Sequence, residues 1–427
     1  MADIQPFAGT RYNPEHVHLG GVLAPPYDVI SDAKREELYG RDMRNIVRID
    51  DGERLPDDVE GERDRYTRAA SFLKSWLDLG VLVRDDAPSF YVVDHHFPNP
   101  AGGERRRRGV LGTVPATAWE RSDLLPHELT MSGPKADRLA LMHATHAQTS
   151  PVFAMWSGAA ADIEEVLARD TSGHALLGGR IDGEFGSEKL LVWRLSDPPH
   201  VAAIVAALRD ARLYVADGHH RYETAAAFAA ERRAADPSAP PDAPFERSLV
   251  YLTAAHDPGI TILPTHRLVR PGPGIAFSLD DLWARLDDTY ETAPAPGARA
   301  ALVRAAELRA THHAFAVVAQ DGAAVLSRPR RSTESPRQGL DVMVLETEVL
   351  GPAGVSPDAI TAGALTYTRD TDRLEAAVHG GEAVLGFGVA PVTTEEVIAV
   401  SDARETLPQK STYFYPKVPT GLVLYEV

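Results

Sequence analysis

Five consecutive residues in the middle of the chain combine side chains that suit phosphate binding. The run Asp217-Gly218-His219-His220-Arg221 follows a short apolar stretch of strand character, and an alanine-rich segment after it predicts a helix. Backbone N–H groups and the dipole at a helix start attract anions, and a glycine lets a phosphate approach closely. We therefore interpret the run as the phosphate end of a nucleotide site, with Asp217 as ligand for Mg²⁺ or for an acceptor hydroxyl.

Two other interpretations of this run remain open. Asp-Gly is also an ordinary turn, and a helix can begin with histidine and arginine for solubility alone. A zinc site is a weaker alternative, because adjacent histidines such as His219 and His220 point in different directions from a helix or a strand.

A second segment carries acid, base and cationic groups together. It begins at Leu125-Pro126-His127-Glu128-Leu129-Thr130 and continues to Lys135, Asp137 and Arg138. If it faces the Asp217 loop, Glu128 is the predicted general base, and Lys135 or Arg138 would neutralise transferring phosphate oxygens. The alternative is a polar loop followed by a capped helix start.

Three weaker candidates lie elsewhere in the chain. Pro25-Pro26 makes a rigid turn that fixes Tyr27 and Asp28, which, with His127, are predicted to bind substrate; a purely structural turn is the alternative. His266 would extend the anion pocket unless its segment is an ordinary surface element. Lys410 lies in a hydroxyl- and aromatic-rich segment that suits a wall over a purine and phosphates, or else a terminal core strand.

The chain resembles a known family over nearly its whole length. The run at Asp217 is similar to the G-x-x-R element of the ParB/sulfiredoxin superfamily, whose members bind nucleotide phosphates there. The whole chain resembles more closely the bacterial domain-of-unknown-function family 1015. The blocks that carry this resemblance are Ala24–Ile30, Pro126–Thr130, Gly133–Arg138, Ala216–Ala225, Leu263–Arg267 and Lys410–Lys417. The nearest functional analogue is the free-serine kinase of that superfamily, which has a D-G-H-x-R element; this is an analogy at the level of fold.

Composition excludes several classes of protein. The 427 residues carry a net charge of −17, which argues against general nucleic-acid binding, and no cysteine is present for disulfides or thiolate chemistry. No signal-peptide pattern or long apolar stretch is seen, so we expect a cytoplasmic protein without a membrane partner. A homodimer is left open. The basic run Arg105–Arg108 is predicted to form a solvated hairpin turn, with contact to a nucleotide or partner as the alternative.

Helical and strand patterns alternate irregularly along the chain. Together with hairpins they predict an α+β fold of mixed sheets with flanking helices, and the resemblance implies a ParB/sulfiredoxin-like core with large insertions. Three regions are expected: 1–195, 196–275 with the phosphate motif, and 276–427. The predicted elements include helices over 56–79, 137–146, 199–208 and 298–308 and strands over 90–97, 109–114, 151–156 and 247–254.

These observations predict a small-molecule kinase. ATP or ADP would be the donor, Mg²⁺ the inferred metal, and a hydroxyl of an amino acid such as serine the acceptor. The catalytic residues would be Glu128, Asp217 and His220. Two alternatives use the same anion site: a nucleotide-hydrolysing switch similar to CTP-hydrolysing ParB proteins, or a phosphatase.

Overall fold

The computed structural model describes residues 2–128, 132–158, 162–171, 173–286, 288–331, 335–408 and 410–427. The chain forms two compact units. Unit 1 contains Met1–Pro126, Thr130–Thr261 and Pro416–Val427, and unit 2 contains His127–Leu129 and Ile262–Tyr415. Each unit combines mixed or antiparallel sheets with helices, which confirms the predicted α+β class.

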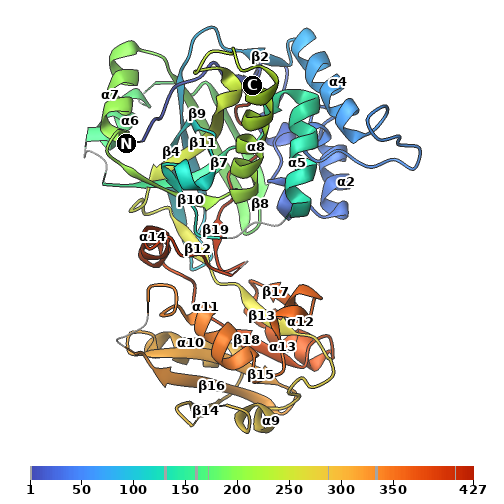
Figure 1. The fold of residues 1–427 in the computed structure, drawn as a ribbon, viewed down its shortest axis with the longest axis vertical. Helices are drawn as coiled ribbons and strands as arrows, with labels where there is room; N and C mark the ends of the chain where they lie inside the picture. The colour runs from blue at the N-terminus through green and yellow to red at the C-terminus, as the bar shows by residue number, and fades with distance from the viewer. Residues whose placement is uncertain are drawn as a thin grey trace. The chain divides into compact units, whose positions relative to one another are not determined.

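Unit 1 is built on an eight-stranded mixed sheet (Figure 1). Its strands, in spatial order, are β5 (Leu124–Leu125), β10 (Arg212–Asp217), β7 (Val152–Ser157), β11 (Arg247–Ala254), β4 (Glu104–Pro115), β3 (Phe90–Pro98), β9 (Gly186–Leu195) and β8 (Leu177–Gly183). Strand β10 runs parallel to β5, and β11 runs parallel to β7, whereas the other pairs are antiparallel. Two-stranded sheets pair β1 (Thr10–Tyr12) with β2 (Leu82–Arg84) and β6 (Ala147–Gln148) with β20 (Tyr425–Glu426).

Helices flank the central strands of unit 1, and Figure 1 shows α4 and α5 on one side and α6 and α7 on the other. The helices are α1 (Leu19–Val22), α2 (Asp32–Arg41), α3 (Val47–Asp50), α4 (Arg65–Asp78), α5 (Ser132–Thr145), α6 (Asp162–Asp170), α7 (Pro198–Leu208) and α8 (His219–Ala235). Three 3-10 turns are η1 (Tyr27–Val29), η2 (Trp119–Arg121) and η3 (Pro244–Glu246). Strands β7, β10 and β11 are buried along most of their length, because helices cover them.

Unit 2 has a six-stranded sheet in the order β14 (Glu291–Ala295), β16 (Gly322–Pro329), β15 (His312–Ala319), β18 (Leu385–Gly388), β13 (His266–Val269) and β17 (Leu365–Thr368). Strands β12 (Thr261–Leu263) and β19 (Tyr413–Tyr415) form a separate pair. The helices are α9 (Leu279–Trp283), α10 (Ala298–Leu308), α11 (Asp341–Val344), α12 (Pro357–Thr361), α13 (Thr371–His379) and α14 (Thr394–Asp402), with a π-helical turn η4 at Leu345–Leu350. Helices α10 and α13 bury alanine, leucine and valine side chains against the sheet.

Unit 1 contains most of the predicted region 1–195 and residues 196–261 of the second region, whereas residues 262–275 belong to unit 2. Strands β10 and β11 from the second region pair with β4, β5 and β7 from the first, so a single sheet joins them. The helix predicted over 56–79 begins only at Arg65, because Asp64 and Thr67 form a capping box there. In the part of the chain that the structure describes, no helix is long and apolar enough to cross a membrane.

The basic run Arg105–Arg108 does not form a turn, and that prediction was wrong. The hairpin turn lies earlier, where Asn99 and Gly103 share a backbone hydrogen bond, and all four arginines belong to β4. Arg108 pairs with Asp94 across the hairpin at 2.6 Å, and Arg107 is buried with its guanidinium over the ring of Phe153. Alternating burial along a strand explains why one arginine is buried and its neighbours are not.

Candidate functional site

The predicted phosphate loop has the expected local structure in unit 1. Strand β10 ends at Asp217, Gly218 adopts a left-handed conformation with φ of +92°, and α8 begins at His219. No side chain caps the helix at Gly218. The positive φ favours glycine here, and a Cβ atom would lie only 2.8–2.9 Å from the guanidinium of Arg221 and would displace it.

Asp217 is the centre of an ion cluster. Its Oδ2 accepts a hydrogen bond from Arg221 Nη2 at 2.5 Å, and its Oδ1 accepts one from Lys417 Nζ. Burial alone would raise the pKa of Asp217, but the charges of Lys417 and Arg221 outweigh burial and lower it to about 2. The carboxylate is therefore ionised at neutral pH and pairs with two cations.

The antiparallel pairing of β10 with β7 explains a second anchor for Arg221. Because the strands run in opposite directions, the start of β7 lies beside the end of β10, with Asp217 opposite Phe153 after an irregularity in register. Arg221 Nη1 donates to Ser150 Oγ at 2.8 Å and to the carbonyl of Pro151. These contacts fix the guanidinium over Gly218.

The buried Arg107 anchors the backbone next to Lys417, the second cation of the cluster. Arg107 Nη2 donates to the carbonyl of Pro416 at 2.9 Å, which holds the backbone directly before Lys417. Lys417 ends the block Lys410–Lys417, for which the sequence left two interpretations open: a wall over a purine and phosphates, with the lysine as a point charge, or a terminal core strand with the lysine exposed. No local pattern links it to Asp217, which lies 200 residues earlier.

A narrow pocket of about 40 Å³ adjoins Arg221 within unit 1. Three predicted site residues from distant segments line it: Tyr27, Arg138 and Arg221. The guanidinium of Arg138 lies 4.2 Å from the ring centroid of Tyr27. Burial, followed by the charge of Asp28, raises the pKa of Tyr27 to about 12, so its hydroxyl stays protonated and can donate a hydrogen bond.

Asp50 also lines this pocket, and sequence reasoning missed it. Its Oδ1 accepts hydrogen bonds from Thr149 Oγ1 at 2.5 Å and Arg138 Nη1 at 3.3 Å. Its Oδ2 is buried and has no hydrogen-bond partner among the described residues. A buried carboxylate oxygen without a partner is costly, so this atom is suited to accept a hydrogen bond from a bound group or water.

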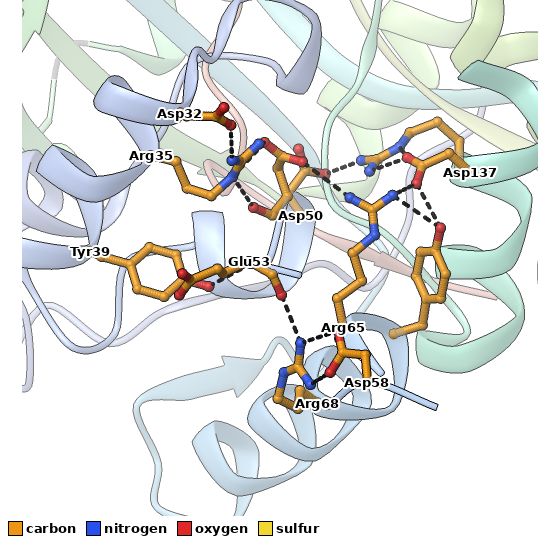
Figure 2. Close-up of polar contacts among 12 residues, drawn as sticks. Asp32, Arg35, Tyr39, Asp50, Glu53, Asp58, Arg65, Arg68 and Asp137 are labelled. Atoms are coloured by element: carbon orange, nitrogen blue, oxygen red, sulfur yellow. Dashed lines mark hydrogen bonds and ion pairs between the residues drawn. The ribbon is translucent and has the colours of Figure 1, made fainter. Parts of the chain in front are cut away.

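A network of ion pairs extends outward from Asp50 (Figure 2). Arg138 Nη2 lies 2.7 Å from Asp137 Oδ2, and the other oxygen of Asp137 pairs with Arg65 and accepts a hydrogen bond from Tyr66 Oη at 2.7 Å. Arg138 therefore stands between two carboxylates. These two contacts fix the position of the Arg138 side chain at the pocket, and Asp137 neutralises part of its positive charge.

Lys135 does not join the Asp217 cluster directly. Its Nζ lies 2.7 Å from Glu223 Oε2, on the first turns of α8, and Glu223 Oε1 accepts a hydrogen bond from Trp119 Nε1 at 2.7 Å. His219 is buried with its ring centroid 6.3 Å from that of Trp119, and the carbonyl of His220 accepts a hydrogen bond from Thr224. Leu129 and Thr130 lie outside the described residues.

The remaining predicted residues, apart from Asp28, belong to unit 2. The carboxylate of Glu128 accepts a hydrogen bond from the backbone N–H of Lys410 at 3.3 Å, and His127 is buried 3.0 Å from Thr412 Oγ1. Burial lowers the pKa of His266 to about 4, so its imidazole is neutral at physiological pH. The pairing of Glu128 with Asp217 stays a prediction. Asp28 lies in the exposed 3-10 turn η1 of unit 1.

Comparison with known proteins assigns the chain to a family. The chain belongs to the family described as protein of unknown function DUF1015, whose model matches residues 4–343. This confirms the resemblance drawn from the sequence, whereas a ParB/sulfiredoxin-like core stays a prediction. No curated protein matches the chain.

Several solved structures match the chain at low sequence identity and low TM-score. A conserved hypothetical protein from Pyrococcus furiosus is 13% identical, with a TM-score of 0.35 over 70% of this chain and 90% of that chain. A free serine kinase in complex with AMP is 12% identical, with a TM-score of 0.35 over 70% of this chain and 89% of that chain. SbnI with a C-terminal truncation, from Staphylococcus aureus, is 12% identical, with a TM-score of 0.36 over 73% of this chain and 85% of that chain.

Proposed function

We propose that this protein is a phosphotransferase that binds ATP or ADP at Gly218–Arg221 and phosphorylates a hydroxyl of a small molecule, an amino acid such as serine. One observation carries the proposal: two cations and an ionised carboxylate meet at a left-handed glycine, at the start of the 17-residue helix α8. The two cations, together with the helix dipole, favour a phosphate at this place.

Nucleotide phosphates would compete with Asp217 for its cationic partners. Arg221 and Lys417 would then contact phosphate oxygens and neutralise the charge that develops during transfer, which is the main requirement of phosphoryl transfer. Asp217 is a weak base because its pKa is about 2, so it suits orientation of a metal or a hydroxyl better than proton abstraction.

The donor set around Asp217 fits Mg²⁺. The described residues contain no cluster of three or more histidine or acidic side chains that could form a closed metal cage. Mg²⁺ usually rests on one or two carboxylates, with water and phosphate oxygens as the other ligands, and Asp217 supplies such a carboxylate. When bound, the ion would add positive charge beside the phosphates.

The narrow pocket beside Arg221 supports a small polar acceptor. A volume of about 40 Å³ accommodates about three water-sized groups, enough for a charged head group. Arg138 and Tyr27 can donate hydrogen bonds to a carboxylate there, and the unpartnered oxygen of Asp50 can accept one from an ammonium group. Glu128 remains the predicted base for the acceptor hydroxyl, and His220 remains a predicted contact to the phosphates.

The first experiment measures nucleotide binding by isothermal titration calorimetry with ATP, ADP and CTP in the presence of Mg²⁺. Arg221→Ala removes a buried cation from the loop, so we expect ATP affinity to fall at least 100-fold. Arg232→Ala is the matched control, because Arg232 is exposed near the other end of α8, and it should change the affinity less than twofold. Unchanged affinity in Arg221→Ala would exclude this loop as the nucleotide site.

The second experiment measures turnover. Wild-type protein is incubated with the nucleotide that binds and with serine, and phosphoserine is followed by ³¹P NMR. Phosphoserine formation that is lost in Arg221→Ala supports the kinase. Nucleoside diphosphate and free phosphate without a phosphorylated acceptor would instead support a nucleotide-hydrolysing switch. Release of phosphate from phosphoserine alone would support a phosphatase.

A further inference from the structure

A larger pocket, of about 600 Å³, lies beside α8 in unit 1. It is formed by one face of the helix and the segment 116–121 that contains η2, and it also includes Glu246. Its volume falls within the range of small-molecule sites, about 300–1,000 Å³. The narrow pocket beside Arg221 has a different lining apart from α8, so the two are separate features of the same unit.

The lining of this larger pocket suits a flat aromatic ring. Trp119 and Tyr222 stack with their ring centroids 4.4 Å apart and their planes inclined by 26°. Trp119 is only half-buried, and Glu223 fixes its indole through the hydrogen bond to Nε1. The helix contributes the small side chains of Ala226, Ala227 and Ala230, which leave room beside the indole.

Charged groups stand at the edge of this pocket. Arg121 is exposed, and among the described residues its side chain forms no hydrogen bond or ion pair. A guanidinium of this kind can stack on a nucleobase or reach its acceptor atoms. Arg233, in contrast, is held by Glu246 at 2.5 Å, so it serves to shape the wall.

The pocket begins one helical turn from the phosphate loop. Tyr222 follows Gly218 by four residues, and its N–H donates to the Gly218 carbonyl at 3.1 Å. At a rise of about 1.5 Å per residue, the two positions are about 6 Å apart along the helix axis. A ribose can span a separation of this size between a base and its first phosphate.

We propose that the pocket lined by Trp119, Tyr222 and Ala227 binds the nucleobase of a nucleotide whose phosphates lie at Gly218–Arg221. This inference rests on the proposed function, because it takes the position of the phosphates from it. It adds a site for the base, made by an aromatic pair and the alanine face of α8, with Arg121 as a further contact.

The test separates the base from the phosphates by using two probes, ATP and inorganic tripolyphosphate, in calorimetric titrations of the full-length protein. Ala227→Leu fills the pocket from an exposed helix position near Tyr222 with a residue of good helix propensity. It should weaken ATP at least tenfold and leave tripolyphosphate within twofold. Ala234→Leu, two turns further along α8 and outside the pocket, is the matched control and should change neither.

Trp119→Ala provides a second, independent variant. Stacking on an aromatic side chain contributes strongly to base binding, so this variant should also weaken ATP at least tenfold but leave tripolyphosphate within twofold. If both variants bind ATP as the wild type does, the base site is excluded while the phosphate site stands. If the wild type binds neither probe, the proposed function is wrong, and the base site is excluded with it.

Discussion

The chain contains two His-Arg pairs, and their surroundings give them different chemical properties. His220-Arg221 lies at the start of α8 in unit 1, and Arg221 pairs with the ionised Asp217 beside a pocket. His266-Arg267 begins the buried strand β13 in unit 2, where burial lowers the pKa values of both side chains. The same two residue types thus form a charged cluster in one unit and a largely desolvated pair in the other.

The difference arises from partners as well as from burial. Arg221 has a carboxylate partner at 2.5 Å, whereas Arg267 donates to the carbonyl of Thr265 and lies 5.8 Å from the ring centroid of Tyr367. His266 accepts a hydrogen bond from the backbone N–H of Val389 at 3.3 Å, which requires a neutral ring nitrogen. Burial without a carboxylate in contact favours the neutral form of His266, whereas a guanidinium such as that of Arg267 stays charged.

The largest effect is expected from removing the counter-ion in unit 1. Asp217→Asn removes the carboxylate that Arg221 and Lys417 share, and breaking a buried ion pair in this way costs about 3–5 kcal/mol. We expect a loss of about 3 kcal/mol in the free energy of unfolding of unit 1, measured by urea denaturation at pH 7.5. Added tripolyphosphate should restore more stability to this variant than it adds to the wild type.

Asp372→Asn is the control for that comparison. Asp372 pairs with Arg299, but about three quarters of each side chain is exposed, so the change should stay below about 0.5 kcal/mol. A similarly small loss in Asp217→Asn would mean that the Asp217 cluster adds little to stability. The proposed difference between the His220-Arg221 and His266-Arg267 pairs would then be wrong.

A smaller effect is expected from acid in unit 2. The pKa of His266 is lowered from 6.5 to about 4 by burial and by the charge of Arg267, partly opposed by Asp370. The unfolded chain then binds a proton below pH 6.5 that the folded chain does not, so stability falls as the pH drops from 6.5 toward 4. Between pH 7.5 and pH 5 we expect a loss of about 2 kcal/mol.

Hydrogen exchange of peptides from β13 and β18 measures this loss locally, because amide exchange reports opening of the strands around His266. His266→Gln keeps an acceptor for the Val389 N–H but does not titrate in this range. In this variant, β13 and β18 should therefore lose most of the pH dependence of their opening free energy that the wild type shows between pH 7.5 and pH 5. Equal pH dependence in wild type and variant would show that His266 is not the titrating group.

Much of the local structure could be predicted from the sequence, but the partners of the charged groups could not. Strand β11 and helix α10 have the predicted bounds, because apolar runs and helical propensity are local properties. The link between Lys417 and Asp217 depends on tertiary packing, and so does the contact of Asp50 with Arg138. The burial of Arg107 within β4 could not be predicted either, because it depends on packing against Phe153 of β7 and Tyr251 of β11.

The smallest effect is expected when the histidine of unit 2 is tested for nucleotide binding. The sequence places His266 among the phosphate-binding residues, but an imidazole with a pKa of about 4 is neutral at pH 7.5 and offers no positive charge. His266→Gln should therefore change ATP affinity by less than twofold in calorimetric titrations at pH 7.5, where Arg221→Ala loses at least 100-fold. A tenfold loss in His266→Gln would mean that this imidazole contributes directly to the anion site. The two His-Arg pairs would then serve one ligand, despite the difference in their partners.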